Sequence, residues 1–320
     1  MEVAYDAVGR TVAGVKGDAK LRVRCPGAVL RLQVSRRRNP RLLVLFHGAV
    51  KPDRRHLVTE FNTPRLATLV DANVLAVTDP SLEQSPTLTA SWYLGHEAFH
   101  SQRLLTKLFR QVEARLKTTR TVFVGGSAGG FAALYYSWAS PGSVAVTVNP
   151  QTSLSRHRSS HQAAYRAACW PNLPPDQALS TVVHEDLTML YRKRVPNSVV
   201  YLQNCMDPYH LRNHLAPFLG AIRPNDLAKV VTDVGFWGTV GHSNSIPRQV
   251  WFDWAKAALH AESTSAVALL EAHALTTLPG EHRRTETGPK TGRAVADADI
   301  AIARHLANLA KNALAAGESP

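Results

Sequence analysis

A serine, an aspartate and a histidine that could together perform acyl transfer follow one another along this 320-residue chain. Ser127 lies in TVFVGGSAGG (121–130), where an apolar run leads into Gly-x-Ser-x-Gly and then into a small-residue segment. A serine at such a strand-to-helix turn is held clear of the sheet, and the flanking glycines remove Cβ atoms that would clash. The start of the following helix also favours the negative charge that develops on an attacked carbonyl oxygen. We therefore predict that Ser127 is a nucleophile.

The expected acid and base come after the serine in the order Asp, His, each following a later apolar run. Asp207 follows the run at 198–204, and His242 follows a weaker run at 228–231. His242 would take the Ser127 proton and return it to the leaving group, while Asp207 fixes the imidazole tautomer and stabilises the imidazolium. The order and the loop placement together predict a Ser-Asp-His triad.

A second carboxylate competes with Asp207 for the role of triad acid. Asp233 lies at the end of the weak run, just before Gly-Phe-Trp (235–237). It shares the connection that carries His242, whereas Asp207 lies on a loop of its own and can approach the imidazole nitrogen that faces away from the serine. Asp207 is the preferred acid, and Asp233 is expected to brace the histidine loop.

The site also needs two N–H donors for the oxyanion, and one of them usually comes from a loop after an early strand. The run LLVLF (42–46) leads into His47-Gly48-Ala49. We expect the backbone N–H of Ala128 as one donor and that of Gly48 or Ala49 as the other. His47 would order this loop rather than react. The aromatic side chains predicted to line a substrate pocket are Trp92, Tyr93 and Trp237.

Strand-like and helical segments that could position these residues alternate along the chain. Two β-like runs around Pro26-Gly27 predict an antiparallel hairpin, at 21–24 and 28–34. Further apolar runs suit buried strands, at 42–46, 73–77, 121–124, 144–148, 198–202 and, more weakly, 228–231. Helical spacing occupies 101–116, 128–138 and 251–259. This alternation predicts an α/β fold in which a mostly parallel sheet has helices on both faces.

The domain organisation expected from these elements is one catalytic domain with a C-terminal extension. Residues 1–40 hold the N-terminal β-hairpin, which belongs to the main domain, and 41–277 form the α/β core. Residues 278–293, rich in Thr, Gly, Pro and charge, are expected to be a linker. An alanine-rich amphipathic helix with a short tail is expected over 294–320.

The chain resembles the α/β-hydrolase family through LLVLFHG, VFVGGSAGG, QNCMD and VGHS, which occur in that order between residues 42 and 259. This resemblance implies a fold and a reaction class, not a substrate. More loosely, WYLG (92–95) and NPQT (149–152) are similar to segments of hydrolase-like proteins from bacterial surface-polysaccharide clusters. The chain departs from common esterases in lacking a long apolar lid segment, which argues against long-chain triglycerides.

A zinc motif competes with this interpretation. His96-Glu97-Ala98-Phe99-His100 fits His-Glu-x-x-His, in which two histidines on successive helical turns bind zinc while the glutamate activates water. The motif opens the helix that leads toward the nucleophile strand, and no third ligand completes it. His210 and His214 have the same spacing, and for both pairs a solvated or capping helix face is the expected role. We predict no metal and no cofactor.

Composition and charge narrow the classes of partner. A formal net charge of +13 would suit an anionic partner, but the arginines are spread along the chain and no nucleic-acid-binding motif accompanies them. No apolar run approaches the length of a membrane span, and no secretory signal is visible, so a soluble, cytoplasmic protein is expected. Three widely separated cysteines are expected to be buried thiols: Cys25, Cys169 and Cys205.

These observations predict a serine hydrolase that acts through an acyl-enzyme on a carboxylic ester. A small-molecule ester or an acylated or anionic glycan would be the substrate. The alternatives are an acyltransferase, a zinc metallohydrolase that uses His96, Glu97 and His100, and a non-catalytic binding or assembly protein of surface-polysaccharide biosynthesis.

Overall fold

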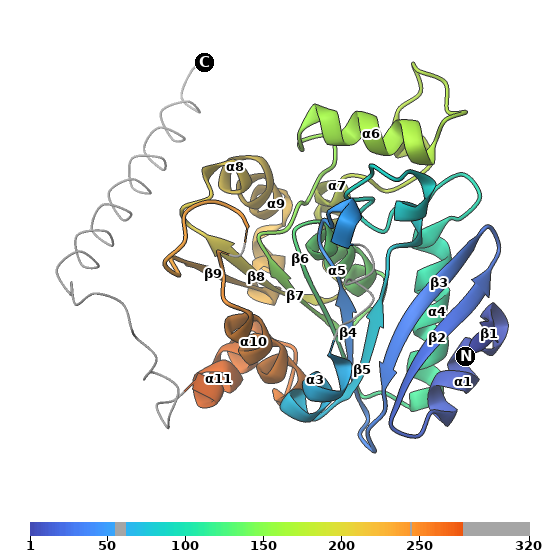
Figure 1. The fold of residues 1–320 in the computed structure, drawn as a ribbon. Coiled ribbons are helices and arrows are strands. Elements are labelled where there is room, and N and C mark those ends of the chain that lie inside the picture. Colours follow the sequence, from blue (N-terminus) through green and yellow to red (C-terminus); the bar gives the residue numbers. More distant parts are fainter. Residues whose placement is uncertain (55–61, 244, 278–320) are drawn as a thin grey trace, which may run out of the picture. The chain divides into compact units, whose positions relative to one another are not determined.

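A nine-stranded sheet forms the centre of the protein in a computed structural model, which describes residues 1–54, 62–243 and 245–277 (Figure 1). Its strands are β1 (Glu2–Ala4), β2 (Asp18–Cys25), β3 (Ala28–Ser35), β4 (Arg41–Phe46), β5 (Asn73–Val77), β6 (Arg120–Gly126), β7 (Val144–Val148), β8 (Ser198–Asn204) and β9 (Val230–Gly235). They lie in the order β1-β2-β3-β5-β4-β6-β7-β8-β9. The strands from β5 to β9 in this order are all parallel, whereas β3 is antiparallel to both β2 and β5.

The parallel strands bring four loops to one edge of the sheet. Phe46 of β4 pairs with Gly125 of β6, and Val148 of β7 pairs with both Gly126 of β6 and Leu202 of β8. Because neighbouring parallel strands end at the same edge, the loops that follow β4, β6, β7 and β8 must meet there. The sheet therefore gathers segments that are far apart in the sequence.

Helices cover both faces of the sheet (Figure 1). They are α1 (Val8–Gly14), α3 (Thr63–Val70), α4 (Ser101–Leu116), α5 (Ala128–Trp138), α6 (Ser159–Cys169), α7 (Leu187–Lys193), α8 (Pro208–His210), α9 (Ala216–Ala221), α10 (Arg248–His260) and α11 (Ala266–Thr277). Along β4 the buried residues alternate between two cores: Val44 packs in the core with α1, α4, α5 and α7, and Leu43 in the core with α3, α10 and α11. The sheet is thus buried on both sides, which explains its continuous apolar runs.

The predicted fold class is confirmed by this architecture. The hairpin is β2 and β3, and each apolar run lies in or overlaps a strand. Two predicted helices match α4 and α5 residue for residue, and α10 begins three residues earlier than predicted. The weak run at 228–231 overlaps only the start of its strand, because β9 spans Val230–Gly235. The predicted linker at 278–293 and helix at 294–320 lie outside the described residues.

The expectation that all three cysteines are buried is wrong in part. Cys169 is 1% exposed, whereas Cys25 and Cys205 are partly exposed because Cys25 ends β2 and Cys205 directly follows β8. In the described parts of the chain, no helix is long and apolar enough to cross a membrane.

Candidate active site

Ser127 lies at a sharp turn between β6 and α5, in a strained backbone conformation with φ 56° and ψ −119°. The neighbouring glycines make this turn possible. A Cβ at Gly125 would lie 2.1 Å from the carbonyl oxygen of Gly129, and a Cβ at Gly129 would lie 2.5 Å from that of His47. Strand, helix and the β4 loop therefore approach one another more closely than any larger residue allows, and the strained serine is held by its surroundings.

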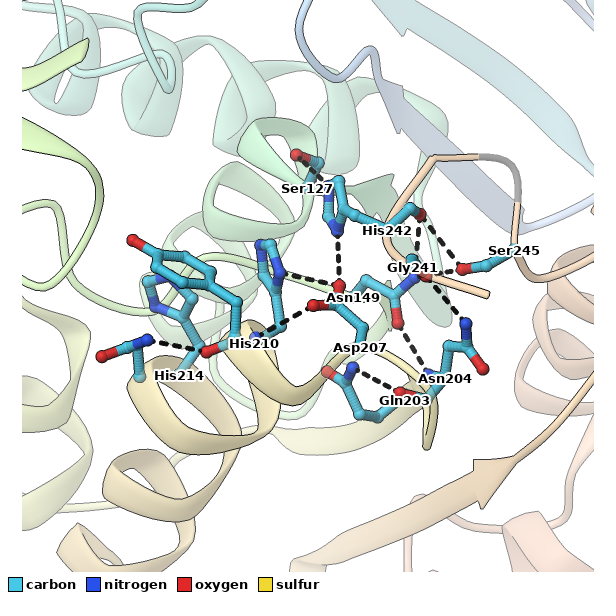
Figure 2. A network of polar contacts seen from close by, with 12 residues as sticks. Ser127, Asn149, Gln203, Asn204, Asp207, His210, His214, Gly241, His242 and Ser245 are labelled. Carbon is cyan, nitrogen blue, oxygen red and sulfur yellow. Dashed lines mark hydrogen bonds and ion pairs between the residues drawn. The ribbon is translucent and has the colours of Figure 1, made fainter. Parts of the chain in front are cut away.

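The structure brings the three residues of the predicted triad together, with His242 between Ser127 and Asp207 (Figure 2). His242 Nε2 lies 2.9 Å from Ser127 Oγ, and His242 Nδ1 lies 3.0 Å from Asp207 Oδ2. Asp207 follows β8 and caps α8, where its Oδ1 accepts the backbone N–H of His210 at 3.1 Å. This is the arrangement that a general base needs between a nucleophile and an orienting carboxylate.

Asp233 takes no part in this chain of contacts. Its Oδ2 accepts the indole N–H of Trp254 in α10 at 2.9 Å, so it links β9 to the helix beneath it. The geometry therefore favours Asp207 over Asp233 as the partner of His242.

A second histidine shares Asp207 with His242, and sequence reasoning missed it. The His210 ring stacks on the His242 ring with centroids 3.9 Å apart and an interplanar angle of 10°. Its Nδ1 lies 2.8 Å from Asp207 Oδ2, the oxygen that faces His242. His210 is 4% exposed, so the solvated or capping role expected for it is wrong: α8 turns the ring inward, toward the carboxylate. His214 is also fully buried.

The charge state of Asp207 follows from these two imidazoles. Burial alone would raise the pKa of Asp207, but hydrogen bonds with His210 and His242 outweigh it and hold that pKa well below its usual range. Burial lowers the pKa of His210, against the opposing effect of Asp207. Asp207 is thus ionised and His210 neutral at neutral pH.

Gln151, in the loop after β7, is the other residue that sequence reasoning did not single out. Its Nε2 lies 2.9 Å from Ser127 Oγ and 3.1 Å from His210 Nε2. A signal was available, because Gln151 follows the apolar run of β7 just as Asp207 follows that of β8.

The loop expected to supply an oxyanion donor lies beside the nucleophile. A Cβ at Gly48 would be 3.6 Å from Ser127 Cβ. His47 Nδ1 contacts Gly48 O at 2.8 Å and its Nε2 accepts the Asp79 backbone N–H at 3.0 Å, which fits the bracing role expected of it. Ala128 is the first residue of α5, where backbone N–H groups have no intrahelical acceptor. Gly48, Ala49 and Ala128 thus stay the predicted donors.

The three aromatic residues predicted as pocket walls have different surroundings. Trp92 is 2% exposed and donates its indole N–H to Gln151 Oε1 at 3.2 Å. Tyr93 is 1% exposed, and its hydroxyl donates to Val77 O and accepts from the His47 backbone N–H. Both side chains are therefore buried, and they hold Gln151 and the loop after β4 by hydrogen bonds. Trp237 is partly buried and covers Gly235 at the end of β9.

The residues of the zinc motif are not arranged as metal ligands. His96 bonds Ser81 Oγ at 3.0 Å, and Glu97 accepts from both the backbone and the side chain of Asn172. The helix begins only at Ser101, so the expectation that the motif opens it is wrong. Without helical backbone the two histidines do not share a face.

Histidines do gather beside the triad, where His157, His210 and His214 offer nitrogens within 4.8 Å of one another. Two of these rings already use one nitrogen in a hydrogen bond. His214 Nδ1 accepts the Thr152 backbone N–H at 3.2 Å, which puts the ring proton on Nε2, and His210 Nε2 contacts Gln151. A metal ion bound through His214 Nδ1 or His210 Nε2 would have to displace the hydrogen bond at that nitrogen.

No model of a known protein family matches the sequence, and no curated protein matches it. Its fold is similar to an S-formylglutathione hydrolase from Agrobacterium tumefaciens, with 16% identity, a TM-score of 0.52, and coverage of 76% of this chain and 100% of that one. It is also similar to the capsule O-acetyltransferase of Neisseria meningitidis serogroup A, with 15% identity, a TM-score of 0.51, and coverage of 73% and 94%. At such low identity the likeness shows the fold alone. With its mostly parallel sheet and the sharp turn at Ser127 between β6 and α5, the chain has the α/β-hydrolase fold.

Proposed function

We propose that this protein is a serine hydrolase that cleaves carboxylic esters through an acyl-enzyme. The observation that carries the proposal is the continuous chain of contacts from Ser127 Oγ through His242 to Asp207, at a strained turn whose glycines permit no larger side chain. A buried, ionised carboxylate behind the imidazole is what such a base requires.

The reaction would proceed in two halves. In the first, Ser127 Oγ bonds to the ester carbonyl carbon while its proton passes to His242 Nε2 and the carbonyl π-electron pair moves to oxygen. The backbone N–H groups of Ala128 and of Gly48 or Ala49 would stabilise that oxyanion. The oxyanion pair then re-forms the carbonyl as the ester C–O bond breaks, and His242 gives its proton to the departing oxygen. The alcohol leaves, and the acyl group stays on Ser127. In the second half, water repeats these steps and releases the acid.

A fluorophosphonate probe tests the proposal, because it reacts covalently only with an activated serine. We expect one probe adduct per chain in intact-mass spectra, located on Ser127, and release of p-nitrophenol from short-chain esters. Ser127→Ala should lose both while keeping its fold by circular dichroism. Unchanged ester hydrolysis in that variant would refute the mechanism. Absence of labelling in the folded wild-type protein would instead indicate a binding protein with a hydrolase fold.

The same acyl-enzyme could pass its acyl group to an alcohol instead of water. An acylated or anionic glycan is the first substrate class to test, because the net charge of +13 attracts anionic polymers and one protein of similar fold is a capsule O-acetyltransferase. Time courses with a p-nitrophenyl ester, with and without added glycan, separate the outcomes. Transfer gives an acylated glycan, whereas hydrolysis gives the free acid only.

A further inference from the structure

The orientation of the Gln151 amide is fixed by a single neighbour. An indole N–H can only donate, and that of Trp92 points at one end of the amide at 3.2 Å. That end must therefore be the carbonyl oxygen. The NH₂ group then occupies the other end, 2.9 Å from Ser127 Oγ and 3.1 Å from His210 Nε2.

This orientation decides where the hydroxyl proton of Ser127 points. The Gln151 NH₂ group donates and cannot accept, so Ser127 Oγ is the acceptor of that hydrogen bond. The hydroxyl proton is then left for the other neighbour of Oγ, His242 Nε2, at 2.9 Å. The proton thus lies on the path that general-base catalysis requires.

The second hydrogen of the same NH₂ group sets the tautomer of His210. Because His210 Nε2 accepts it, the ring proton of the neutral imidazole is on Nδ1, which faces Asp207 Oδ2 at 2.8 Å. His242, which accepts at Nε2 from the serine, likewise presents its Nδ1 proton to Asp207. Asp207 Oδ2 therefore lies close to the Nδ1 atoms of both rings.

We propose that Gln151 is a catalytic residue that directs the Ser127 hydroxyl proton toward His242, and that Trp92 is the positioning residue that sets the direction of its amide. The inference rests on the proposed function, since it concerns the same nucleophile. In the attack step, the proton goes from Ser127 Oγ to His242 Nε2 as the bond from Oγ to carbon forms. Gln151 gains and loses no proton. It holds a donor on the lone pair of Oγ that does not attack.

Replacing the amide by a carboxylate reverses the hydrogen bond, so Gln151→Glu is the sharpest test. An ionised Glu would accept the Ser127 proton and draw it away from His242. We expect fluorophosphonate labelling at pH 8 to slow by about 100-fold, the scale of losing one preorganised donor at a reacting oxygen. The rate relative to wild type should recover as pH falls and the carboxyl becomes protonated, because a protonated Glu can donate again. Gln151→Met, which has no donor, should slow labelling by about 10-fold at every pH.

Trp92→Phe tests the positioning role, because it keeps an aromatic side chain but removes the indole N–H together with the five-membered ring that carries it. The amide is then free to turn over, and we expect labelling to slow by about threefold to tenfold. In a Gln151→Met background the same substitution should have no further effect. Trp170→Phe is the matched control: this buried indole donates to Tyr165 instead, and labelling should match wild type.

The outcomes separate failure of this inference from failure of the proposed function. Wild-type protein that does not label at Ser127 removes the proposed function and this inference together. Labelling in wild type with an unchanged rate in Gln151→Met overturns the role of Gln151 alone. A Gln151→Glu rate whose ratio to wild type does not vary with pH has the same consequence. Equal losses in Trp92→Phe and Trp170→Phe would reduce Trp92 to ordinary packing, and thermal unfolding checks that each variant is folded.

Discussion

Two histidine pairs with the same four-residue spacing have opposite surroundings in this protein. His96 and His100 carry the only part of the sequence that reads as a zinc motif, yet one is buried against Ser81 and the other is exposed. His210 and His214 belong to no motif, yet both are buried and their rings lie 5.0 Å apart beside the triad. The pair that fits no motif is therefore the one beside the candidate triad.

The difference comes from the backbone between the two members of each pair. Gly95, with φ 104°, leads into a tight turn in which His96 and Phe99 exchange backbone hydrogen bonds. The second pair lies on the continuous helical segment that starts at Pro208 and keeps both rings on one side. Spacing therefore indicates a shared face only where the chain is helical between the two residues.

The carboxylates Asp79 and Asp207 also differ, both in their hydrogen-bond partners and in the direction in which their pKa is shifted. Asp79 accepts the backbone N–H groups of Tyr93 and of Ser81, the residue that bonds His96, and burial raises the pKa of Asp79 to about 6. Asp207 contacts two imidazoles, which hold its pKa well below the usual range despite burial. Imidazole partners thus keep the buried carboxylate of Asp207 charged, while burial raises the pKa of Asp79, whose carboxylate has no imidazole partner among the described residues.

The largest loss of rate is expected when Asp207, the charged carboxylate of the two, is neutralised. Asp207→Asn leaves His242 without the acceptor that fixes its tautomer and stabilises the imidazolium. We expect kcat for ester hydrolysis to fall by about 10⁴-fold, as when a triad carboxylate is neutralised in the serine-protease template. Asp233→Asn is the control, because that carboxylate bonds Trp254 instead, and its loss should be far smaller. The reverse ranking in folded variants would make Asp233 the triad acid.

A smaller effect is expected from removing the nitrogens of the second histidine. His210→Phe keeps a ring stacked on His242 but loses the contact with Asp207 and the acceptor for Gln151. We expect kcat to fall by about 10-fold with KM unchanged, the scale of one or two lost hydrogen bonds. The ring of His161 stacks on His157 and does not contact Asp207, so His161→Phe should leave kcat unchanged. Steady-state kinetics with one p-nitrophenyl ester would check both, and a fall in the two variants alike would contradict the specific role.

The pKa of Asp79 predicts a pH dependence of stability rather than of rate. Because its folded-state pKa is about 6, above its unfolded value of about 4, the folded state binds the proton more tightly. The resulting stabilisation is complete below pH about 4 and is lost as pH rises through about 6. Urea unfolding of Asp79→Asn should therefore show a smaller fall in stability across that window than wild type. An identical slope in the two proteins would mean that Asp79 is not the titrating group.

The fold and the order of the candidate triad could be predicted from the sequence, because both depend on local patterns. Apolar runs predicted the strands. The segments that follow three of these runs contain Ser127, Asp207 and the loop after Phe46. Gln151 also follows a run, but the roles of Gln151 and His210 could not be predicted, since their contacts depend on how neighbouring strand ends meet. The role of Trp92 was also out of reach, because its positive φ of 50° is a tertiary constraint that nothing in the residue type indicates.

The smallest effect is expected at the zinc motif, where His96→Ala and His100→Ala should each change the rate of ester hydrolysis by less than about twofold. Neither ring reaches the candidate triad, and His96 instead bonds Ser81 Oγ and contacts Gly27 O at 3.3 Å. His96→Ala leaves a buried hydroxyl without that partner, so its cost should appear as about 1 kcal/mol of unfolding free energy. His100 is exposed and should cost less. The metal content and the ester hydrolysis rate are measured for wild type and for both variants. Together they decide whether the zinc motif or the candidate triad carries the reaction. One tightly bound zinc per wild-type chain, lost together with activity in both variants, would restore the metallohydrolase and remove the serine mechanism.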